Sequence, residues 1–330
     1  MKKILQYLFD YKILSREQAK DVLINISRGE YNDYEITAFA AAYLMRSITV
    51  DELQGFCDAL LELCVKVNFS EYELIDIVGT GGDGKNTFNI STLACFIVAG
   101  TGLKVAKHGN YGASTISGAS NVMEQLGYKF SSDESKLKTE LDKANICFLH
   151  APLFHPALKT VAPMRKQFGL RTFFNMLGPL INPANPAFQL LGVYSLEMAR
   201  LYNYVLQKTN RTYSIAFSLD GYDEISLTSD AKILSRKGEL IATPEELGRI
   251  QVLPKDIFGG NTLKDAANMF KAIIKGNGSV AQNAVVLANA AVALHCTGKY
   301  KTYNETFDAA EESLQSGKAY QCLQELISLQ

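Results

Sequence analysis

Residues 79–86 read GTGGDGKN, and this stretch decides how the rest of the chain is interpreted. It follows the apolar run YELIDIV at 72–78 and precedes STLACFIVAG at 91–100, so we expect a strand, a glycine loop and a buried helix in succession. Glycines at such a junction let backbone N–H groups approach a phosphate, and the N-terminus of the helix adds partial positive charge. The stretch therefore predicts an anion site at the end of a strand.

The loop also comes within one residue of a Walker A motif, GxxxxGK followed by Ser or Thr. Gly79, Gly84 and Lys85 match this motif, whereas Asn86 does not. The distinguishing residue is Asp83, because a carboxylate inside a loop around a triphosphate would repel it. Beside a sugar, the same carboxylate could accept hydrogen bonds from hydroxyls or help to hold a cation. We therefore disfavour an ATPase.

The pattern around this loop predicts an α/β fold with a small all-helical domain in front of it. Three helix starts before residue 65 carry the capping-box spacing. They are Ser15 with Gln18, Asn32 with Glu35, and Thr49 with Glu52. From residue 72 onward, strands alternate with helices, which indicates a large domain with a mostly parallel central sheet flanked by helices. We expect the small domain at 1–68, with part of 160–185 packing on it, and the large domain at 69–330.

Two later segments refine this prediction. Residues 231–253 contain strand-like pieces with a turn at Lys237 and Gly238, which suggests a hairpin at the sheet edge. Residues 283–296, NAVVLANAAVALHC, are apolar on nearly all sides and predict a buried helix.

Composition excludes several classes of protein. The 330 residues carry 33 basic and 34 acidic side chains, so no overall charge favours nucleic acid or an anionic membrane as a partner. The six cysteines form no CxxC pair, which argues against a zinc site or a disulfide framework and favours reduced core thiols. The longest weakly polar stretch, 93–103, is far too short to span a membrane. We expect a cytoplasmic protein that does not bind membranes.

A second polar motif should lie at the same sheet edge as the glycine loop. KHGN at 107–110 follows the predicted strand LKVA, and the small polar run GASTISGAS at 112–120 comes next. Polar residues Asn89, Ser91 and Thr92 begin the helix after the glycine loop, although Ser91 alone could be only an N-cap. Ligands of parallel sheets bind beyond the carboxyl ends of the strands, so these motifs predict one shared site.

Together with VAPMRKQFGLRTFFNMLGPLINPA at 161–184 and GYDEIS at 221–226, these motifs resemble the anthranilate phosphoribosyltransferase family. The resemblance runs in order across essentially the whole chain. It implies a small helical domain packed on a larger α/β domain, an active site in the cleft between them, and a homodimer. It also implies Mg²⁺-dependent transfer of a phosphoribosyl group from phosphoribosyl diphosphate to the amine of anthranilate, in tryptophan biosynthesis.

The resemblance assigns three sets of site residues. The set for phosphoribosyl diphosphate comprises Gly79, Gly81, Gly82, Asp83, Thr87, Asn89, Ser91, Thr92, Lys107, Ser114, Ser117 and Ser120. The set for anthranilate comprises Gly79, His108, Asn110, His155, Arg165 and Gly178. The set for magnesium comprises Ser91, Asp223 and Glu224. No residue is implied as a covalent nucleophile.

Elementary chemistry agrees with these implied roles. Mg²⁺ prefers a few hard oxygen ligands completed by water and substrate phosphate, and we expect Asp223 and Glu224 to offer theirs from a solvent-accessible loop. A guanidinium pairs with a carboxylate through two hydrogen bonds, which suits Arg165 to anthranilate. His155 heads an HPA turn that we expect to start the helix carrying Arg165.

Two alternatives and one assembly hypothesis complete the sequence analysis. A pyrimidine nucleoside phosphorylase would share the fold but should lack the motif from Arg165 to Pro183. A non-enzymatic paralogue that binds nucleic acid should carry a basic face and lose the glycine loop or the acidic pair. The N-terminal helices have more apolar surface than so small a unit can bury, so we expect a homodimer contact there.

Overall fold

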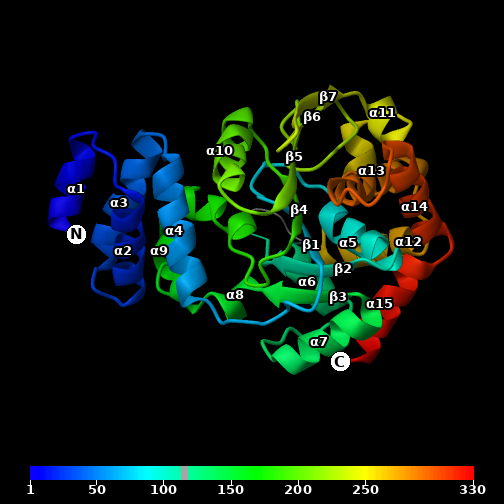
Figure 1. Cartoon of the computed structure of the whole chain (residues 1–330), viewed down its shortest axis with the longest axis horizontal. Coiled ribbons are helices and arrows are strands. Elements are labelled where there is room, and N and C mark those ends of the chain that lie inside the picture. Colours follow the sequence, from blue (N-terminus) through cyan, green and yellow to red (C-terminus); the bar gives the residue numbers. More distant parts are fainter. Residues whose placement is uncertain (113–117) are drawn as a thin grey trace. The chain divides into compact units, whose positions relative to one another are not determined.

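The computed structural model describes residues 1–112 and 118–330, and these residues divide into two compact units. A helical unit consists of Met1–Val67 and Ala151–Asn185. An α/β unit consists of Asn68–His150 and Pro186–Gln330. The chain therefore leaves the first unit, builds part of the second, returns to the first and then completes the second (Figure 1).

The first segment of the helical unit forms four helices. They are α1 (Lys2–Phe9), α2 (Arg16–Ser27), α3 (Asp33–Met45) and α4 (Val50–Leu63). The last three begin at the predicted capping boxes, where Ser15, Asn32 and Thr49 each accept a hydrogen bond from the backbone N–H three residues later. The third helical residue bonds back to the cap in each case. These starts are therefore confirmed.

The second segment of the helical unit, Ala151–Asn185, forms several short helices. It contains α8 (Ala151–Phe154), the 3₁₀ helix η1 (Pro156–Lys159), α9 (Ala162–Phe168), and the 3₁₀ helices η2 (Phe173–Met176) and η3 (Gly178–Leu180). Phe173 joins this segment to α3 and α4, because its ring centroid lies 5.9 Å from Phe39, 5.0 Å from Tyr43 and 4.5 Å from Phe56. Each such aromatic pair contributes about 0.5–1.5 kcal/mol beyond its buried area.

One buried carboxylate organises the same unit. Glu52 accepts hydrogen bonds from the backbone N–H of Leu14, at 3.0 Å, and from the hydroxyl of Tyr43, at 3.1 Å. It also pairs with Arg46 and with Thr49. Burial alone would raise the pKa of Glu52, but the bonds from Arg46, Thr49 and Leu14 outweigh it and leave that pKa lowered. Glu52 is therefore a satisfied structural charge.

The α/β unit is built on one seven-stranded sheet in the order β3-β2-β1-β4-β5-β6-β7 (Figure 1). Its strands are β1 (Leu74–Gly79), β2 (Lys104–Gly109), β3 (Ile146–His150), β4 (Phe188–Gly192), β5 (Thr212–Ser218), β6 (Ala231–Ser235) and β7 (Gly238–Ala242). The first five pair in parallel, and β6 and β7 form an antiparallel hairpin at the edge. The mostly parallel sheet and its edge hairpin are as predicted.

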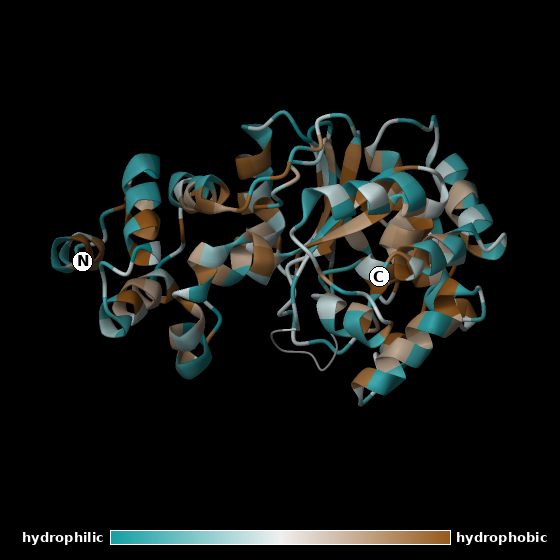
Figure 2. Cartoon of the chain, turned by 90° about the horizontal axis from the view of Figure 1, so that it is seen from below, coloured by the Kyte–Doolittle hydropathy of each residue, from teal (hydrophilic) through white to brown (hydrophobic). Residues whose placement is uncertain are grey.

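The sheet is accompanied by ten helical segments of the α/β unit in the described residues. They are α5 (Ile90–Gly100), α6 (Ala119–Gln125), α7 (Glu134–Ala144), α10 (Leu196–Gln207), α11 (Pro244–Gly248), η4 (Pro254–Ile257), α12 (Leu263–Ile274), α13 (Val280–Cys296), α14 (Tyr303–Gln315) and α15 (Lys318–Ser328). Figure 2 shows the hydropathy of each residue. Hydrophilic (teal) and hydrophobic (brown) residues alternate along many helices, and hydrophobic residues prevail on the strands.

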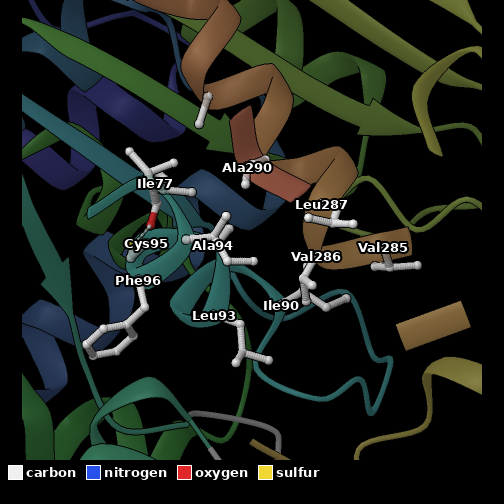
Figure 3. Close-up of a cluster of buried hydrophobic side chains, with 14 of the residues drawn as sticks. Ile77, Ile90, Leu93, Ala94, Cys95, Phe96, Val285, Val286, Leu287 and Ala290 are labelled. Atoms are coloured by element: carbon white, nitrogen blue, oxygen red, sulfur yellow. Dashed lines mark hydrogen bonds between the residues drawn. The ribbon is translucent and has the colours of Figure 1, made fainter. Parts of the chain in front are cut away.

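The core of the α/β unit is formed where α5 and α13 pack together against the sheet. Buried side chains of both helices, including Leu93, Phe96, Val286 and Ala290, belong to one hydrophobic cluster (Figure 3). Helix α13 is buried along most of its length, which confirms the prediction for 283–296. All six cysteines are buried thiols, as predicted. Within the described parts of the chain, none of the helices is both long and apolar enough to cross a bilayer.

Candidate functional site

The glycine loop connects the end of β1 at Gly79 to the start of α5 at Ile90. Gly81, Gly82 and Gly84 have positive φ angles of 66°, 76° and 78°, a conformation that L side chains rarely adopt. The carboxylate of Asp83 accepts a hydrogen bond from the backbone N–H of Lys85 at 2.9 Å, which tightens the turn. The loop therefore has the backbone that close contact with a phosphate requires.

The GYDEIS segment meets this loop directly. The backbone N–H of Gly81 donates to the carboxylate of Asp223 at 2.5 Å, although the two residues are 142 positions apart. A Cβ at Gly79 would lie 2.5 Å from that carboxylate, and a Cβ at Gly192 would lie 1.8 Å from the Asp223 carbonyl oxygen. Because both positions are glycine, Asp223 can lie against the ends of β1 and β4. The expected solvent-accessible loop is therefore wrong for Asp223, which is only 7% exposed, because the two glycines draw it against the sheet.

Glu224 lies beside Ser91 and Lys107. Ser91 donates hydrogen bonds to the Glu224 carboxylate, and the Lys107 ammonium donates to the Ile77 carbonyl at 2.6 Å and to the Ser91 hydroxyl at 3.4 Å. The N-cap of α5 is Asn89, so the interpretation of Ser91 as only an N-cap is wrong. All three proposed magnesium residues thus come together with Lys107 at the carboxyl ends of β1 and β2.

The acidic side chains of this site destabilise one another. Burial raises the pKa of Asp223 well above its ordinary value, and the nearby charges of Glu224 and Asp83 raise it further. Burial also raises the pKa of Glu224, with Lys107 acting in the opposite direction. Like charges held together out of water are costly unless a cation neutralises them. This arrangement fits a bound cation.

The donor set suits magnesium better than a metal that needs a complete protein cage. In residues 1–112 and 118–330, no three His, Cys, Asp or Glu side chains converge as a metal-holding group. Mg²⁺ is commonly bound by one or two carboxylates, with water and substrate phosphates filling its other positions. Asp223, Glu224 and the Ser91 hydroxyl supply such a partial set.

The remaining residues predicted to contact phosphoribosyl diphosphate are distributed around this centre. Thr87 forms an isolated antiparallel bridge with Phe258. Thr92 is buried in the first turn of α5, and Asn89 stands at the start of that helix without a side-chain cap bond. Ser114 and Ser117 lie outside the described residues.

The KHGN motif ends β2 beside the glycine loop, as predicted. The backbone N–H of His108 donates to buried Asp76 at 3.3 Å. The carbonyl of Asn110 accepts from the backbone N–H of Ser120 at 3.2 Å, so the far end of the Ser/Gly-rich run is tied back to KHGN. Asn110 itself is exposed.

Sequence analysis missed His150 at this edge. It is the last residue of β3, in register with Gly109, and its Nδ1 lies 2.9 Å from the hydroxyl of Ser120. Its ring is stacked on Phe130 at 4.4 Å and meets the edge of Tyr111 at 4.8 Å. Burial lowers the pKa of His150. The available signal was its position at the end of the strand ICFLH, next to KHGN.

In the helical unit, Arg165 has the surroundings of an anion-binding residue. It lies on α9, and its guanidinium stands over the ring of Phe174 at 5.7 Å. Burial lowers its pKa, and no carboxylate of the described residues forms an ion pair with it. A desolvated guanidinium without an acidic partner is a ready site for a carboxylate ligand.

His155 and Gly178 are placed in the same unit. The Nε2 of His155 donates to the carbonyl of Ile181 at 3.0 Å, and burial lowers the pKa of His155 to about 4, so its ring is neutral. The HPA turn forms η1, which is separate from α9, so the expectation that it starts the helix of Arg165 is wrong. Thr160 and Val161 form a turn between η1 and α9. Gly178 begins η3.

The helical bundle and the α/β unit are the two domains of a glycosyl transferase. The chain matches the helical bundle domain of the glycosyl transferase family at residues 2–64 and its α/β domain at residues 71–320. It is 55% identical to the anthranilate phosphoribosyltransferase of Flavobacterium johnsoniae, with 100% of this chain and 99% of that protein covered. It is 52% identical to the enzyme of Bacteroides fragilis over the same shares.

Solved structures agree. The anthranilate phosphoribosyltransferase of Thermus thermophilus superposes with a TM-score of 0.92 at 30% identity, covering 98% of each chain. The Saccharomyces cerevisiae enzyme in complex with PRPP and Mg superposes with a TM-score of 0.90 at 27% identity, covering 98% of this chain and 96% of that one. The chain belongs to the anthranilate phosphoribosyltransferase family.

Proposed function

We propose that this protein transfers the 5-phosphoribosyl group of phosphoribosyl diphosphate to the amine of anthranilate, as a step of tryptophan biosynthesis. The observation that carries the proposal is the contact between the glycine loop and Asp223, because it brings the loop proposed for the diphosphate next to the carboxylates proposed for a cation. Residues 69–330 would bind phosphoribosyl diphosphate. Residues 1–68, with part of 160–185, would form the second domain.

Binding of phosphoribosyl diphosphate is assigned to the glycine loop and its neighbours. The N–H groups of the loop and the ammonium of Lys107 would hold the diphosphate, and Asp83 would accept hydrogen bonds from sugar hydroxyls. Asp223, Glu224 and Ser91 would hold Mg²⁺, which when bound supplies positive charge to the leaving diphosphate. The mutual repulsion of the acidic side chains supports this assignment.

Anthranilate is assigned to six residues. Arg165 would pair with its carboxylate. The other five would contact it, and they are Gly79, His108, Asn110, His155 and Gly178. His155 is neutral and donates to the chain, so we assign it an apolar and shape-defining contact rather than a charged one.

The reaction needs positioning and electrostatic stabilisation rather than a protein nucleophile. The bond from C1 of the ribose to the diphosphate oxygen breaks through an oxocarbenium-like state, and the electron pair leaves with the diphosphate. The amine nitrogen forms the new bond to C1 from the opposite face and then loses a proton. Alignment of two bound substrates supplies about 7–11 kcal/mol, and one preorganised donor supplies about 3–4 kcal/mol.

The test is direct. The purified protein with Mg²⁺ and phosphoribosyl diphosphate should consume anthranilate and release one diphosphate per anthranilate, and should leave uridine and thymidine untouched when phosphate is supplied. Absence of anthranilate consumption would refute the proposed function. Phosphorolysis of a pyrimidine nucleoside would favour a nucleoside phosphorylase instead.

We also propose that the helical unit contributes to a homodimer, in the cytoplasm, where six reduced thiols are stable. Large apolar side chains remain exposed on or beside α1 and α3, including Tyr11 (80%), Tyr34 (88%) and Met45 (83%). Exposed apolar groups on or beside two helices that contact each other favour a partner surface. Light scattering at micromolar concentration should give twice the 36.3 kDa chain mass, and a monomer mass would contradict the proposal.

A further inference from the structure

The glycine loop is attached at its far end to a segment that no sequence motif connected with it. The backbone N–H of Gly259 donates to the carbonyl of Asn86 at 2.8 Å, and that of Phe88 donates to the carbonyl of Ile257 at 3.3 Å. Between these bonds, Thr87 and Phe258 form an antiparallel bridge. Residues 257–260, from the end of η4 onward, thus lie antiparallel to residues 86–88 at the exit of the loop.

The side chain of Asn86 adds a bond that backbone pairing cannot supply. Its Nδ2 donates to the carbonyl of Gly260 at 2.9 Å, across 174 positions of sequence. Asn86 is the position at which a Walker A loop has Ser or Thr, and neither hydroxyl is long enough to be expected to replace this amide. The departure from the Walker motif therefore has a structural role in this chain.

Two glycines make the approach possible. A Cβ at Gly259 would lie 2.4 Å from the carbonyl oxygen of Thr87, which is closer than real Cβ contacts. Gly260 has a φ angle of 87°, where a side chain would be strained. The segment is thus shaped to lie against residues 86–88.

The loop needs such support because its own sequence is permissive. Three glycines with positive φ lie between Gly79 and Asn86, and ordering each residue costs about 1–2 kcal/mol of conformational entropy. Its entry is held by the bonds from Thr80 N–H to the Gly192 carbonyl, at 2.9 Å, and from Gly81 to Asp223. Residues 257–260 hold its exit, so the loop is anchored at both ends.

We propose that Asn86 is a positioning residue, which with residues 257–260 holds the glycine loop in the conformation that binds phosphoribosyl diphosphate. The inference rests on the proposed function for the identity of the ligand. Asn86 acts through the loop backbone and is not assigned a contact with substrate. Preorganised donors bind more tightly because less ordering remains to be done on binding.

The experiment compares two substitutions of Asn86 with a matched control. Asn86→Ala removes the amide, and Asn86→Thr completes the Walker A pattern while also removing it. The control is Asn283→Ala, because Asn283 also donates its amide to glycine carbonyls, but those of Gly276 and Gly278, which lie outside the glycine loop. Each protein is titrated calorimetrically with phosphoribosyl diphosphate and Mg²⁺, and KM is measured for each substrate separately.

We expect both Asn86 variants to weaken phosphoribosyl diphosphate binding about tenfold, equivalent to about 1.4 kcal/mol, with the KM for anthranilate unchanged. The control should bind as the wild type does. Gly259→Ala, which forces the segment away, should weaken binding by at least as much. Thermal unfolding of each variant identifies a general loss of structure. If Asn86→Ala does not fold, the binding of phosphoribosyl diphosphate to Asn86→Thr and to Gly259→Ala still tests the inference.

Wild-type binding by both Asn86 variants, equal weakening of both substrates, or the same effect in Asn283→Ala would each overturn the inference. Failure of the proposed function gives a different result, because the wild type would then consume no anthranilate. The calorimetric series would still decide the inference in that case. A difference in phosphoribosyl diphosphate binding between Asn86 variants and control would support it, and no difference would overturn it.

Discussion

Two buried carboxylates, one in each unit, have opposite surroundings. Glu52 in the helical unit receives bonds from Leu14, Tyr43, Thr49 and Arg46, and its pKa is lowered. Asp223 in the α/β unit lies near Asp83 and Glu224, and its pKa is raised well above the ordinary value. Burial acts in the same direction on both, so the difference comes from their neighbours. The first centre stabilises the fold, and the second is arranged for a ligand.

The largest expected effect concerns the stability of the first centre. Glu52→Ala leaves the half-buried Arg46 without its carboxylate partner and the buried N–H of Leu14 and hydroxyl of Tyr43 without their acceptor, and should lower the free energy of unfolding by about 3–5 kcal/mol. Urea unfolding measures this change. The control is Glu62→Ala on the same helix, since the pair of Glu62 with Lys20 is exposed to solvent and should contribute little to stability. An equal loss of unfolding free energy in the two variants would show that Glu52 stabilises the unit no more than an exposed carboxylate does.

At the acidic pair of the α/β unit, we expect substitution to reduce activity rather than stability. The double variant Asp223→Asn with Glu224→Gln should reduce turnover about 100 to 1,000 fold and raise the Mg²⁺ requirement, while the melting temperature is maintained or raised because like charges are removed. Activity against Mg²⁺ concentration and thermal unfolding measure both. Asp220→Asn serves as control, because Asp220 bonds to Thr228 and Ser229 instead. Unchanged magnesium dependence in the double variant would exclude the metal assignment.

The same contrast extends to two arginines of the helical unit. Arg46 is paired with Glu52, whereas Arg165 has no carboxylate partner in the described part of the chain. Arg165→Ala should weaken productive anthranilate binding by about 1.5–3 kcal/mol, or roughly 10 to 150 fold, the range of a hydrogen bond to a charged group. The KM for phosphoribosyl diphosphate should change little. Arg171→Ala is the comparison, and an unchanged KM for anthranilate in Arg165→Ala would remove Arg165 from the site.

The smallest effect concerns a satisfied neutral group. The pKa of His155 is about 4 in the folded chain, and its ordinary value is 6.5. Below pH 6.5, the imidazole is therefore protonated in the unfolded chain but stays neutral in the folded chain. Stability therefore falls as the pH drops through this window, by about 1 kcal/mol between pH 7.5 and 5.5.

His155→Gln keeps an N–H donor and should flatten this part of the pH profile, as measured by urea unfolding at each pH. His150, whose pKa is also lowered by burial, would contribute the slope that remains. A profile that is equally steep in His155→Gln would show that His155 does not titrate as its burial implies.

Local signals determined much of the fold. The capping boxes at Ser15, Asn32 and Thr49 satisfy backbone donors within three residues, so the helix starts were predictable from the sequence. The alternation of strands and helices after residue 72 likewise predicted a mostly parallel sheet, and the turn at Lys237 and Gly238 predicted its edge hairpin. The motifs GTGGDG, KHGN and GYDEIS indicated the family and the residues proposed for its site.

Only the tertiary structure decided which of these parts meet, because those contacts depend on strand order and on close backbone approach rather than on neighbours in sequence. Asp223 is buried because Gly79 and Gly192 leave space for it. His150 reaches Ser120 because β3 lies in register beside β2. Asn86 reaches Gly260 because Gly259 lets two backbones touch, across 174 positions that no local pattern spans.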